Sequence, residues 1–382
     1  MKSIRRPFLI VLLAISMVFV SCVTSQQEAI KETITLPTLQ SSVAVIDKYG
    51  NCTLALSEQE LIDAGYAVGD WTTISIGDFT YEAPIGTAYS DVDKGNYLIR
   101  LNKGSVILAI NYGNLTKTSG AEEGEPVSID LLEKGGYLQE FELRHLVRTE
   151  ERKDYASDAI FANFRSVQFG TIAPNRLYRS ANPILGDARA PYVEALAKLV
   201  GIKTVINLAD DQQSLYAHLD EAPFYKGLVE SGSVIALDMG VTFTDPEFIA
   251  KLKTGLTFMA EHKGPYLIHC NEGKDRAGFV SALLSGLMGA SVDEIVTDYM
   301  TSYQNYYGVE KGTERYAVIS KIITNIFAEL NGGKAVTDKT LKKVSENYLI
   351  KTVGLSSDQI KAIKDNLSDK SVKLEGSITF IF

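Results

Sequence analysis

The sequence predicts an α/β protein in which a small N-terminal β-barrel precedes a central sheet flanked by helices. The chain has 382 residues, more than one hydrophobic core usually serves, so two domains are expected. Residues 43–130 contain short alternating apolar runs separated by Gly, Asn and Asp turns, a pattern typical of a small β-rich domain. Residues 161–370 instead alternate short buried strands with amphipathic helices, as an α/β domain requires.

The β-rich region has three clear alternating runs, at residues 42–46, 71–76 and 105–110. One helix interrupts them, because Ser57 and Glu60 have the spacing of a capping box and Gly65 stands where that helix would end. Residues 131–160 are charged and mixed in composition. We interpret them as the connection between the domains, with 138–146 forming a strand or a helical turn.

The α/β region begins with a helix over 191–200, followed by strands over 203–208 and 234–237. A helix over 246–260 has Pro at its first position, which suits a helix start. Further helices are expected over the ranges 291–300, 313–330, 337–350 and 356–367. The apolar, β-prone residues within 371–382 predict a final strand that pairs with a sheet edge.

The candidate functional site is the loop from Cys270 to Arg276. An apolar run over 265–268 predicts a buried strand before it, and 277–288 predicts a helix after it. In a strand-loop-helix arrangement, the loop N–H groups and the positive end of the helix dipole converge on one point, which suits an anion. The same field favours thiolate over thiol at Cys270, and Arg276 can hold two phosphate oxygens. Gly273 permits a positive φ at the bend.

His269, Cys270 and Arg276 together resemble the signature of the cysteine-dependent protein tyrosine and dual-specificity phosphatases. The residues 273–276, Gly-Lys-Asp-Arg, are similar to the bacterial tyrosine phosphatases with an HCxxGKDR loop, some of which act on phosphoinositides. Residues 177–181, 298–300 and 348–356 also fit this family. The resemblance covers about residues 160–367 and implies hydrolysis of phosphoric monoesters through a phosphocysteine intermediate.

The resemblance also implies a role for each residue of the loop. Cys270 is the nucleophile and His269 orients the loop, although a merely structural role for His269 is equally compatible with the sequence. Arg276 binds the phosphate, as does a set of loop and helix residues: Asn271, Glu272, Gly273, Lys274, Ala277 and Gly278. Two aspartates compete for the role of general acid, namely Asp275 within the loop and Asp238, 32 residues before the cysteine. We favour Asp275.

Two positions of the loop bear on substrate and turnover. Ala277 stands where the family commonly has Ser or Thr, so hydrolysis of the phosphocysteine is expected to be slow. Lys274 is similarly placed to a lysine in the loop of relatives that accept phosphoinositides, and it could pair with a second phosphate on an inositol ring. The alternative is a solvent-exposed lysine with no role in substrate binding. The expected substrates are phosphotyrosine proteins, with phosphoserine and phosphothreonine as further classes, or phosphoinositides. The alternatives are a phytase-like inositol-phosphate phosphatase and a phosphate-binding surface protein with little turnover.

Composition limits the partners. The net charge of −9 argues against nucleic acid. No cofactor or metal is expected, since the four histidines, at 145, 218, 262 and 269, form no cluster in the sequence. Of the three cysteines, Cys52 is expected to be a small buried residue rather than a redox partner of Cys270.

The N-terminus predicts export. Residues 1–21 combine a basic start with an apolar run of about a dozen residues, which is typical of a signal peptide. The sequence before Cys22 resembles the lipobox of bacterial lipoproteins, which implies lipidation of that cysteine and a location at the cell envelope, periplasmic or on the outer surface. A cleaved secretory signal and an uncleaved anchor are the alternatives. Polar residues 22–42 would form a tether.

The β-rich region has a resemblance of its own. Residues 46–51, 65–69, 98–114 and 125–127 resemble the C-terminal β-barrel of the S-adenosylmethionine hydroxide adenosyltransferases. This implies a barrel fold, and a scaffold or docking role is favoured over nucleoside binding.

Overall fold

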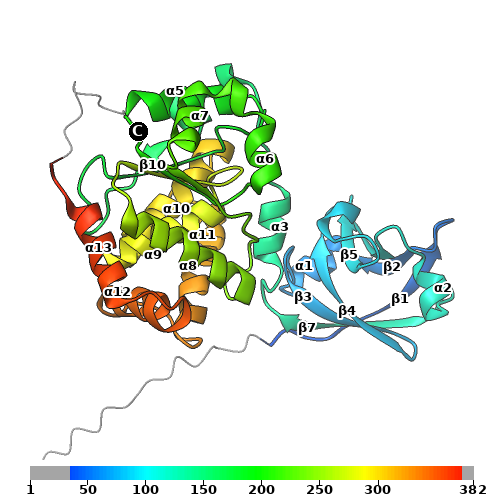
Figure 1. Cartoon of the computed structure of the whole chain (residues 1–382). Coiled ribbons are helices and arrows are strands. Elements are labelled where there is room, and N and C mark those ends of the chain that lie inside the picture. The colour runs from blue at the N-terminus through cyan, green and yellow to red at the C-terminus, as the bar shows by residue number, and fades with distance from the viewer. Residues whose placement is uncertain (1–34, 372–382) are drawn as a thin grey trace, which may run out of the picture.

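The computed structural model describes residues 35–371. The predicted signal peptide (1–21), Cys22 and most of the predicted tether lie outside the described residues, as does the predicted C-terminal strand beyond residue 371. Figure 1 shows two bodies, a barrel formed by the N-terminal part and a larger α/β domain, with helix α3 between them. No helix of residues 35–371 is long and apolar enough to cross a membrane.

The N-terminal body is a closed barrel with the strand order β1-β2-β6-β5-β4-β3-β7. Neighbouring strands are antiparallel except β4 and β5, which are parallel. The predicted barrel fold is therefore confirmed. Its elements are β1 (Leu39–Ile46), β2 (Cys52–Ser57), α1 (Glu58–Asp63), β3 (Trp71–Ile76), β4 (Phe79–Gly86), β5 (Tyr97–Asn102), β6 (Ser105–Ile110), α2 (Leu115–Ser119) and β7 (Pro126–Glu133).

The barrel begins earlier than the predicted range of 43–130. Strand β1 starts at Leu39, which pairs with Ile129 of β7, so four of its residues fall in the predicted tether. Polar side chains at Gln40, Ser41 and Ser42 made this part of the strand look like a tether in the sequence. The barrel core contains buried residues from all seven strands, and Cys52 is among them. Ser57 and Glu60 form the predicted capping box of α1.

The α/β domain is built on a five-stranded sheet with the order β11-β10-β12-β9-β8. All neighbours are parallel except β8 and β9. Its strands are β8 (Arg165–Ser166), β9 (Leu177–Ser180), β10 (Thr204–Asn207), β11 (Val234–Ala236) and β12 (Tyr266–His269). Its helices are α4 (Asp158–Phe161), α5 (Ala190–Leu199), α6 (Gln212–Ala217), α7 (Pro223–Glu230), α8 (Pro246–Glu261), α9 (Arg276–Leu287), α10 (Val292–Tyr307), α11 (Glu314–Leu330), α12 (Asp338–Asn347) and α13 (Ser357–Ser368).

Helices cover both faces of this sheet (Figure 1). The larger core lies between the sheet and α8 to α13, with α9 at its centre, buried from Ala277 to Leu287. The smaller core lies on the opposite face and involves α5 and α7. The predicted arrangement of a central sheet flanked by helices is confirmed, and β12, which precedes the loop at Cys270, is the middle strand.

The predicted connection, residues 131–160, contains helix α3 (Leu138–Arg144). On one side, Arg144 forms an ion pair with Asp93 of the barrel at 2.9 Å. On the other, Gln139 Nε2 donates to the carbonyl of Val318 in α11 at 3.1 Å. The connection therefore includes a helix that contacts both domains.

Candidate active site

The loop from Cys270 to Asp275 lies at the carboxyl end of the central strand β12 and leads directly into α9. In parallel sheets, this edge of the middle strand is where ligands bind. Gly273 sits at the bend with φ of +66°, and a Cβ there would lie 2.1 Å from the carbonyl oxygen of Ser180. Only glycine fits this bend, because a side chain would collide with the neighbouring strand β9.

The carbonyl groups of residues 271–274 all turn away from the inside of the loop, because groups outside the loop bind them. In a trans peptide, the N–H group points opposite to the carbonyl, so the N–H groups of residues 272–275 face inward. Such a set of inward N–H groups forms a cradle for an anion. The backbone N–H of Asn182 donates to the carbonyl of Asn271 at 3.1 Å. The carbonyl of Glu272 accepts from Asn163 Nδ2 at 2.9 Å and from Tyr306 Oη at 2.7 Å. Arg179 Nη2 donates to the carbonyls of Gly273, at 2.5 Å, and Lys274, at 2.9 Å.

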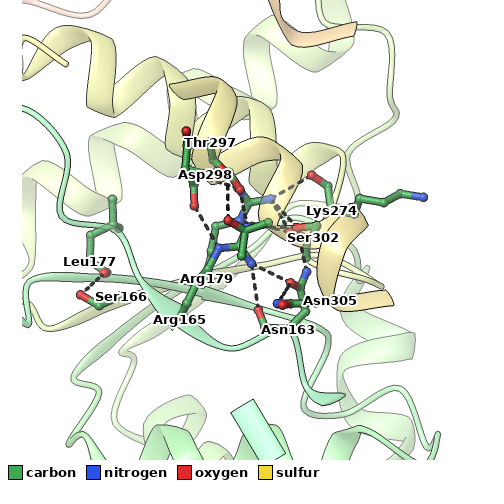
Figure 2. A network of polar contacts seen from close by, with 12 residues as sticks. Asn163, Arg165, Ser166, Leu177, Arg179, Lys274, Thr297, Asp298, Ser302 and Asn305 are labelled. Carbon is green, nitrogen blue, oxygen red and sulfur yellow. Dashed lines mark hydrogen bonds and ion pairs between the residues drawn. The ribbon is translucent and has the colours of Figure 1, made fainter. Parts of the chain in front are cut away.

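Arg179 is held in place by a buried ion pair, which Figure 2 shows from close by. Its Nη1 donates to Asp298 of α10 at 2.6 Å, and the other carboxylate oxygen of Asp298 accepts from Arg165 Nε at 3.0 Å. Burial would raise the pKa of Asp298, but the two arginines outweigh it and lower that pKa. Ser302 Oγ accepts from Arg165 Nη2 at 3.0 Å. A charged scaffold inside the domain therefore fixes the carbonyl side of the loop.

Arg276 opens α9 and contacts backbone on the other side of the loop. Its Nη1 donates to the carbonyl groups of Leu208, at 3.2 Å, and Met239, at 2.9 Å. These residues follow β10 and β11, so the guanidinium is anchored by two neighbouring loops at the same edge of the sheet. A fixed guanidinium beside the cradle supplies the positive charge that a phosphate group needs.

His269 is fully buried at the end of β12 and acts through its neighbours. Its Nε2 lies 2.9 Å from the hydroxyl of Tyr225, and that hydroxyl accepts from Asn207 Nδ2 at 3.2 Å. Tyr225 therefore donates its proton to Nε2, which leaves the ring proton on Nδ1. Burial and the nearby charge of Arg276 lower the pKa of His269 to about 3. His269 is thus neutral at physiological pH.

Comparison with known proteins agrees with this geometry. Residues 161–369 match the tyrosine phosphatase family, and residues 41–128 match the C-terminal domain of SAM hydroxide adenosyltransferases. The chain belongs to the tyrosine phosphatase family. The family resemblance predicted from the loop and the resemblance of the barrel are both confirmed, and the α/β domain is that of a cysteine-based phosphatase.

Solved structures resemble separate parts of this chain. The core catalytic domain of the PP-IP phosphatase SIW14 from S. cerevisiae is 21% identical over 45% of this chain and 93% of its own, with a TM-score of 0.26. An uncharacterized conserved protein from Thermotoga maritima is 21% identical over 25% of this chain and 38% of its own, with a TM-score of 0.24. A conserved hypothetical protein from Thermus thermophilus is 24% identical over 24% of this chain and 34% of its own, with a TM-score of 0.19.

This chain therefore spans between a third and two fifths of the length of the two bacterial proteins. No curated protein matches it.

Asp275 and Lys274 face a cavity of about 530 Å³ beside the loop. Asp275 is the N-cap residue of α9, yet its side chain makes no capping hydrogen bond and stays available for chemistry. Burial raises the pKa of Asp275, and the carboxylate of Glu272 adds to the increase, against the opposing charge of Lys274. A carboxyl group with a raised pKa retains its proton to higher pH, as a general acid must. The other lining residues of this cavity include Tyr299, Tyr303, Tyr307, Phe243 and Arg144.

Asp238 lies elsewhere. Its side chain is 65% exposed, pairs with Lys251 at 3.6 Å and lines a different cavity with Met239 and Asp245. Only its segment approaches the loop, through the carbonyl of Met239 that Arg276 binds. The structure thus brings Asp275, but not the side chain of Asp238, together with Lys274.

The last two predicted phosphate-binding residues are buried in α9. Ala277 is fully buried, and Gly278 lies against the network, since a Cβ there would come within 2.8 Å of Arg179 Nη2 and 2.9 Å of the Tyr299 ring. Gly278 therefore allows α9 to pack closely on Arg179. Within residues 35–371, no group of three or more His, Cys, Asp or Glu side chains is placed to hold a metal ion.

The network behind the loop was missed in the sequence, although part of its signal was there. The stretches 177–181 and 298–300 contain Arg179 and Asp298, whose roles were not assigned. The helix predicted to end at residue 300 continues as α10 to Tyr307, so the residues that contact the loop from its last two turns were missed as well. The available signal was the spacing of the tyrosines, because residues three or four positions apart lie on one helix face. Tyr303 follows Tyr299 by four positions, and Tyr306 and Tyr307 follow Tyr303 by three and four.

Proposed function

We propose that the protein hydrolyses phosphoric monoesters through a phosphocysteine intermediate, with phosphotyrosine proteins or phosphoinositides as substrates. The observation that carries this proposal is the loop itself. Four carbonyl groups are held outward, Cys270 begins the loop and Arg276 ends it, so a phosphate placed among the inward N–H groups lies between a nucleophile and a fixed positive charge.

The proposed reaction has two steps. In the first, Cys270 Sγ attacks phosphorus, an S–P bond forms, and the P–O bond to the leaving group breaks while Asp275 gives its proton to the departing oxygen. In the second, water attacks phosphorus, Asp275 takes a proton from that water, and the S–P bond breaks to release phosphate and the Cys270 thiolate. Arg276 and the loop N–H groups hold the three equatorial oxygens throughout.

Asp275 is the proposed general acid because its raised pKa and its place on the cavity both suit the role. Changing Asp275 to Asn should reduce hydrolysis of alkyl phosphates by about 10²- to 10⁴-fold, since poor leaving groups need the proton. Activated aryl phosphates should be affected much less. Asp238→Asn is the matched comparison, and leaving-group dependence in that variant alone would transfer the role to Asp238.

Ala277 bears on the second step. No hydroxyl stands at this buried position, so the family's usual aid to departure of the thiolate is absent. We expect the phosphocysteine to accumulate, and a rapid burst of p-nitrophenol followed by slow turnover would reveal it. A burst with no turnover would instead support the alternative of a phosphate-binding surface protein.

The cavity beside Asp275 suits a ring-bearing leaving group, because tyrosine and phenylalanine side chains line it. Both phenols and inositols fit this description. Inositol phosphates are a second candidate substrate class, favoured by Lys274: Asp275 and Glu272 raise its pKa despite burial, so it stays charged beside the loop.

The decisive experiment is a panel of p-nitrophenyl phosphate, phosphopeptides, phosphoinositides and inositol phosphates, with Cys270→Ser as the blank. We expect phosphate release in the wild type and none above background in the variant. Release that persists in Cys270→Ser would overturn the proposed mechanism.

We further propose that the protein is exported and anchored at the cell envelope by a lipid on Cys22, on the basis of the sequence of residues 1–22. Metabolic labelling with a fatty acid should mark the wild type and leave Cys22→Ala unlabelled. Equal labelling of both would exclude this anchor.

A further inference from the structure

Arg148 of the connection reaches into the catalytic loop. It lies between α3 and α4, 13 residues before the region that matches the tyrosine phosphatase family. Its Nη1 donates to Glu272 Oε1 at 2.5 Å, and Glu272 is the second residue after the nucleophile Cys270. A residue outside the matched region thus contacts the centre of the site.

Glu272 joins Arg148 to Lys274. Its second carboxylate oxygen lies 3.1 Å from Lys274 Nζ, so one carboxylate bridges two cations. Burial would raise the pKa of Glu272, but the charges of Lys274 and Arg148 lower it, and the group is an anion at neutral pH. A carboxylate held between an arginine and a lysine occupies the place that a phosphate group would take in the same pair of cations.

The surroundings hold Arg148 in this position. Its guanidinium lies over the ring of Tyr306 at 4.9 Å, and the hydroxyl of the same tyrosine donates to the carbonyl of Glu272. Arg189 lies over the Tyr306 ring at 5.0 Å and donates through Nη2 to the carbonyl of Thr149, the residue after Arg148. The segment that carries Arg148 is therefore fixed to the site by contacts on both its side chain and its backbone.

We propose that Arg148 and Lys274 form a second anion subsite beside the catalytic cradle, and that the Glu272 carboxylate fills it until a second phosphate group of the substrate displaces it. The substrate class is a phosphomonoester that carries another phosphate on the same ring, whether a soluble inositol bisphosphate or the headgroup of a phosphoinositide. This proposal rests on the proposed phosphatase function.

The arrangement gives selectivity. A substrate with one phosphate has no group to replace Glu272 and gains nothing from Arg148. A substrate with two phosphates exchanges a carboxylate for a group of higher charge between the same two cations, and gains affinity. The selectivity ratio, which is kcat/KM for a bisphosphorylated substrate divided by kcat/KM for p-nitrophenyl phosphate, therefore measures the subsite directly.

The chain offers a matched control. Arg148 and Arg152 lie four residues apart, with side chains 24% and 28% exposed. Arg148 pairs with Glu272 and, through Nε at 2.9 Å, with Glu150, whereas Arg152 pairs with one carboxylate. Each guanidinium lies over a tyrosine ring, that of Tyr306 or Tyr192. Only Arg148 touches the catalytic loop, because the carboxylate partner of Arg152 is Asp158 of α4.

Arg148→Met should lower the selectivity ratio about 10- to 100-fold, the usual range for loss of a charge-assisted contact. Arg152→Met should leave both the ratio and the activity unchanged. Glu272→Gln should raise the ratio, since the competing charge is gone.

Should Arg148→Met fail to fold, Arg148→Lys, which keeps the charge but loses the forked geometry, should give an intermediate ratio. A ratio unchanged in the Arg148 variants would overturn the proposal, as would a fall of the same size in Arg152→Met.

A binding measurement separates this proposal from the phosphatase function. In a Cys270→Ser background, calorimetry with soluble inositol bisphosphate should show weaker binding when Arg148→Met is added, whether or not the wild type turns over. Absence of turnover by the wild type would contradict the proposed function, whereas equal binding with and without Arg148→Met would contradict the subsite. Vesicles that contain phosphatidylinositol bisphosphate form the second arm, and preference between vesicles and the soluble compound identifies the source of the ligand.

Discussion

The barrel and the phosphatase domain each bury a carboxylate, and they use it differently. Asp70 of the barrel is 1% exposed, accepts hydrogen bonds from the backbone N–H groups of Ala67 and Gly135, and pairs with one cation, the half-buried Lys134, at 2.8 Å. Asp298 is 3% exposed and pairs with Arg165 and Arg179, which are themselves buried. The first carboxylate completes the fold of the barrel, whereas the second fixes the direction of a catalytic loop. Buried arginines are costly to desolvate, and here their position serves the site.

Replacing each of the two buried carboxylates should give the largest difference in stability and activity between the two domains. Asp298→Asn leaves two buried arginines without their counter-ion, so the free energy of unfolding should fall by about 3–5 kcal/mol and the loop should lose its support. Asp70→Asn keeps one oxygen for a backbone N–H group and leaves only Lys134, whose side chain is 33% exposed, without its counter-ion, so it should cost less stability and no activity. Urea unfolding and hydrolysis of p-nitrophenyl phosphate check both. Equal loss of activity in the two variants would show that Asp298 has no special link to the loop.

Glycines with positive φ should also differ between the two domains in what their replacement by alanine affects. Gly273→Ala would place a Cβ against Ser180, so the loop must shift, and a shift near 1 Å should lower kcat about 10²-fold. Gly95 of the barrel has φ of +89° and nothing within 4 Å of an added Cβ. Gly95→Ala should therefore cost only about 1–2 kcal/mol of stability from backbone strain, with activity intact. A Gly273→Ala protein with wild-type kcat would refute the required bend.

The smallest expected difference between the domains is the loss of stability in acid. Residues 39–133 contain no histidine, whereas His269 is buried with its pKa lowered to about 3 from 6.5. As pH falls below 6.5, the unfolded chain binds a proton that folded His269 does not, so stability is complete above pH 6.5 and decreases toward pH 3. Between pH 7 and pH 5 this amounts to about 2 kcal/mol. His269→Asn should lose that part of the pH dependence in thermal unfolding, and an unaltered profile would show that His269 titrates normally.

The local parts of this structure were predictable from the sequence. The strand, loop and helix around Cys270 follow from an apolar run, a glycine and a second apolar run, all within about 25 residues. The barrel strands followed from alternation, and Ser57 with Glu60 located α1 correctly. Such signals depend on neighbours in the chain, and the periodicities of strand and helix carry them.

The parts that join distant segments were not predictable. Arg165 and Asp298 are 133 residues apart, and Arg148 and Glu272 are 124 apart. Neither pair produces a periodic pattern in the sequence. The contact within each pair depends on how β8, the connection and α10 pack around the loop. The helix predicted over 291–300 also ended too early for a related reason, because Ser302 in the last turns of α10 accepts from the buried Arg165, a contact that the local sequence does not reveal.

The position of α3 and Arg148 also decides how this protein should be divided for study. A fragment that begins at residue 161, where the family match begins, would omit Arg148 together with Leu143, Arg144 and Leu146, which form one wall of the cavity beside Asp275. Such a fragment would expose the part of α11 that α3 covers, and its cavity would lack that wall. A fragment that keeps this wall of the cavity therefore begins at the start of α3, at Leu138 or just before it.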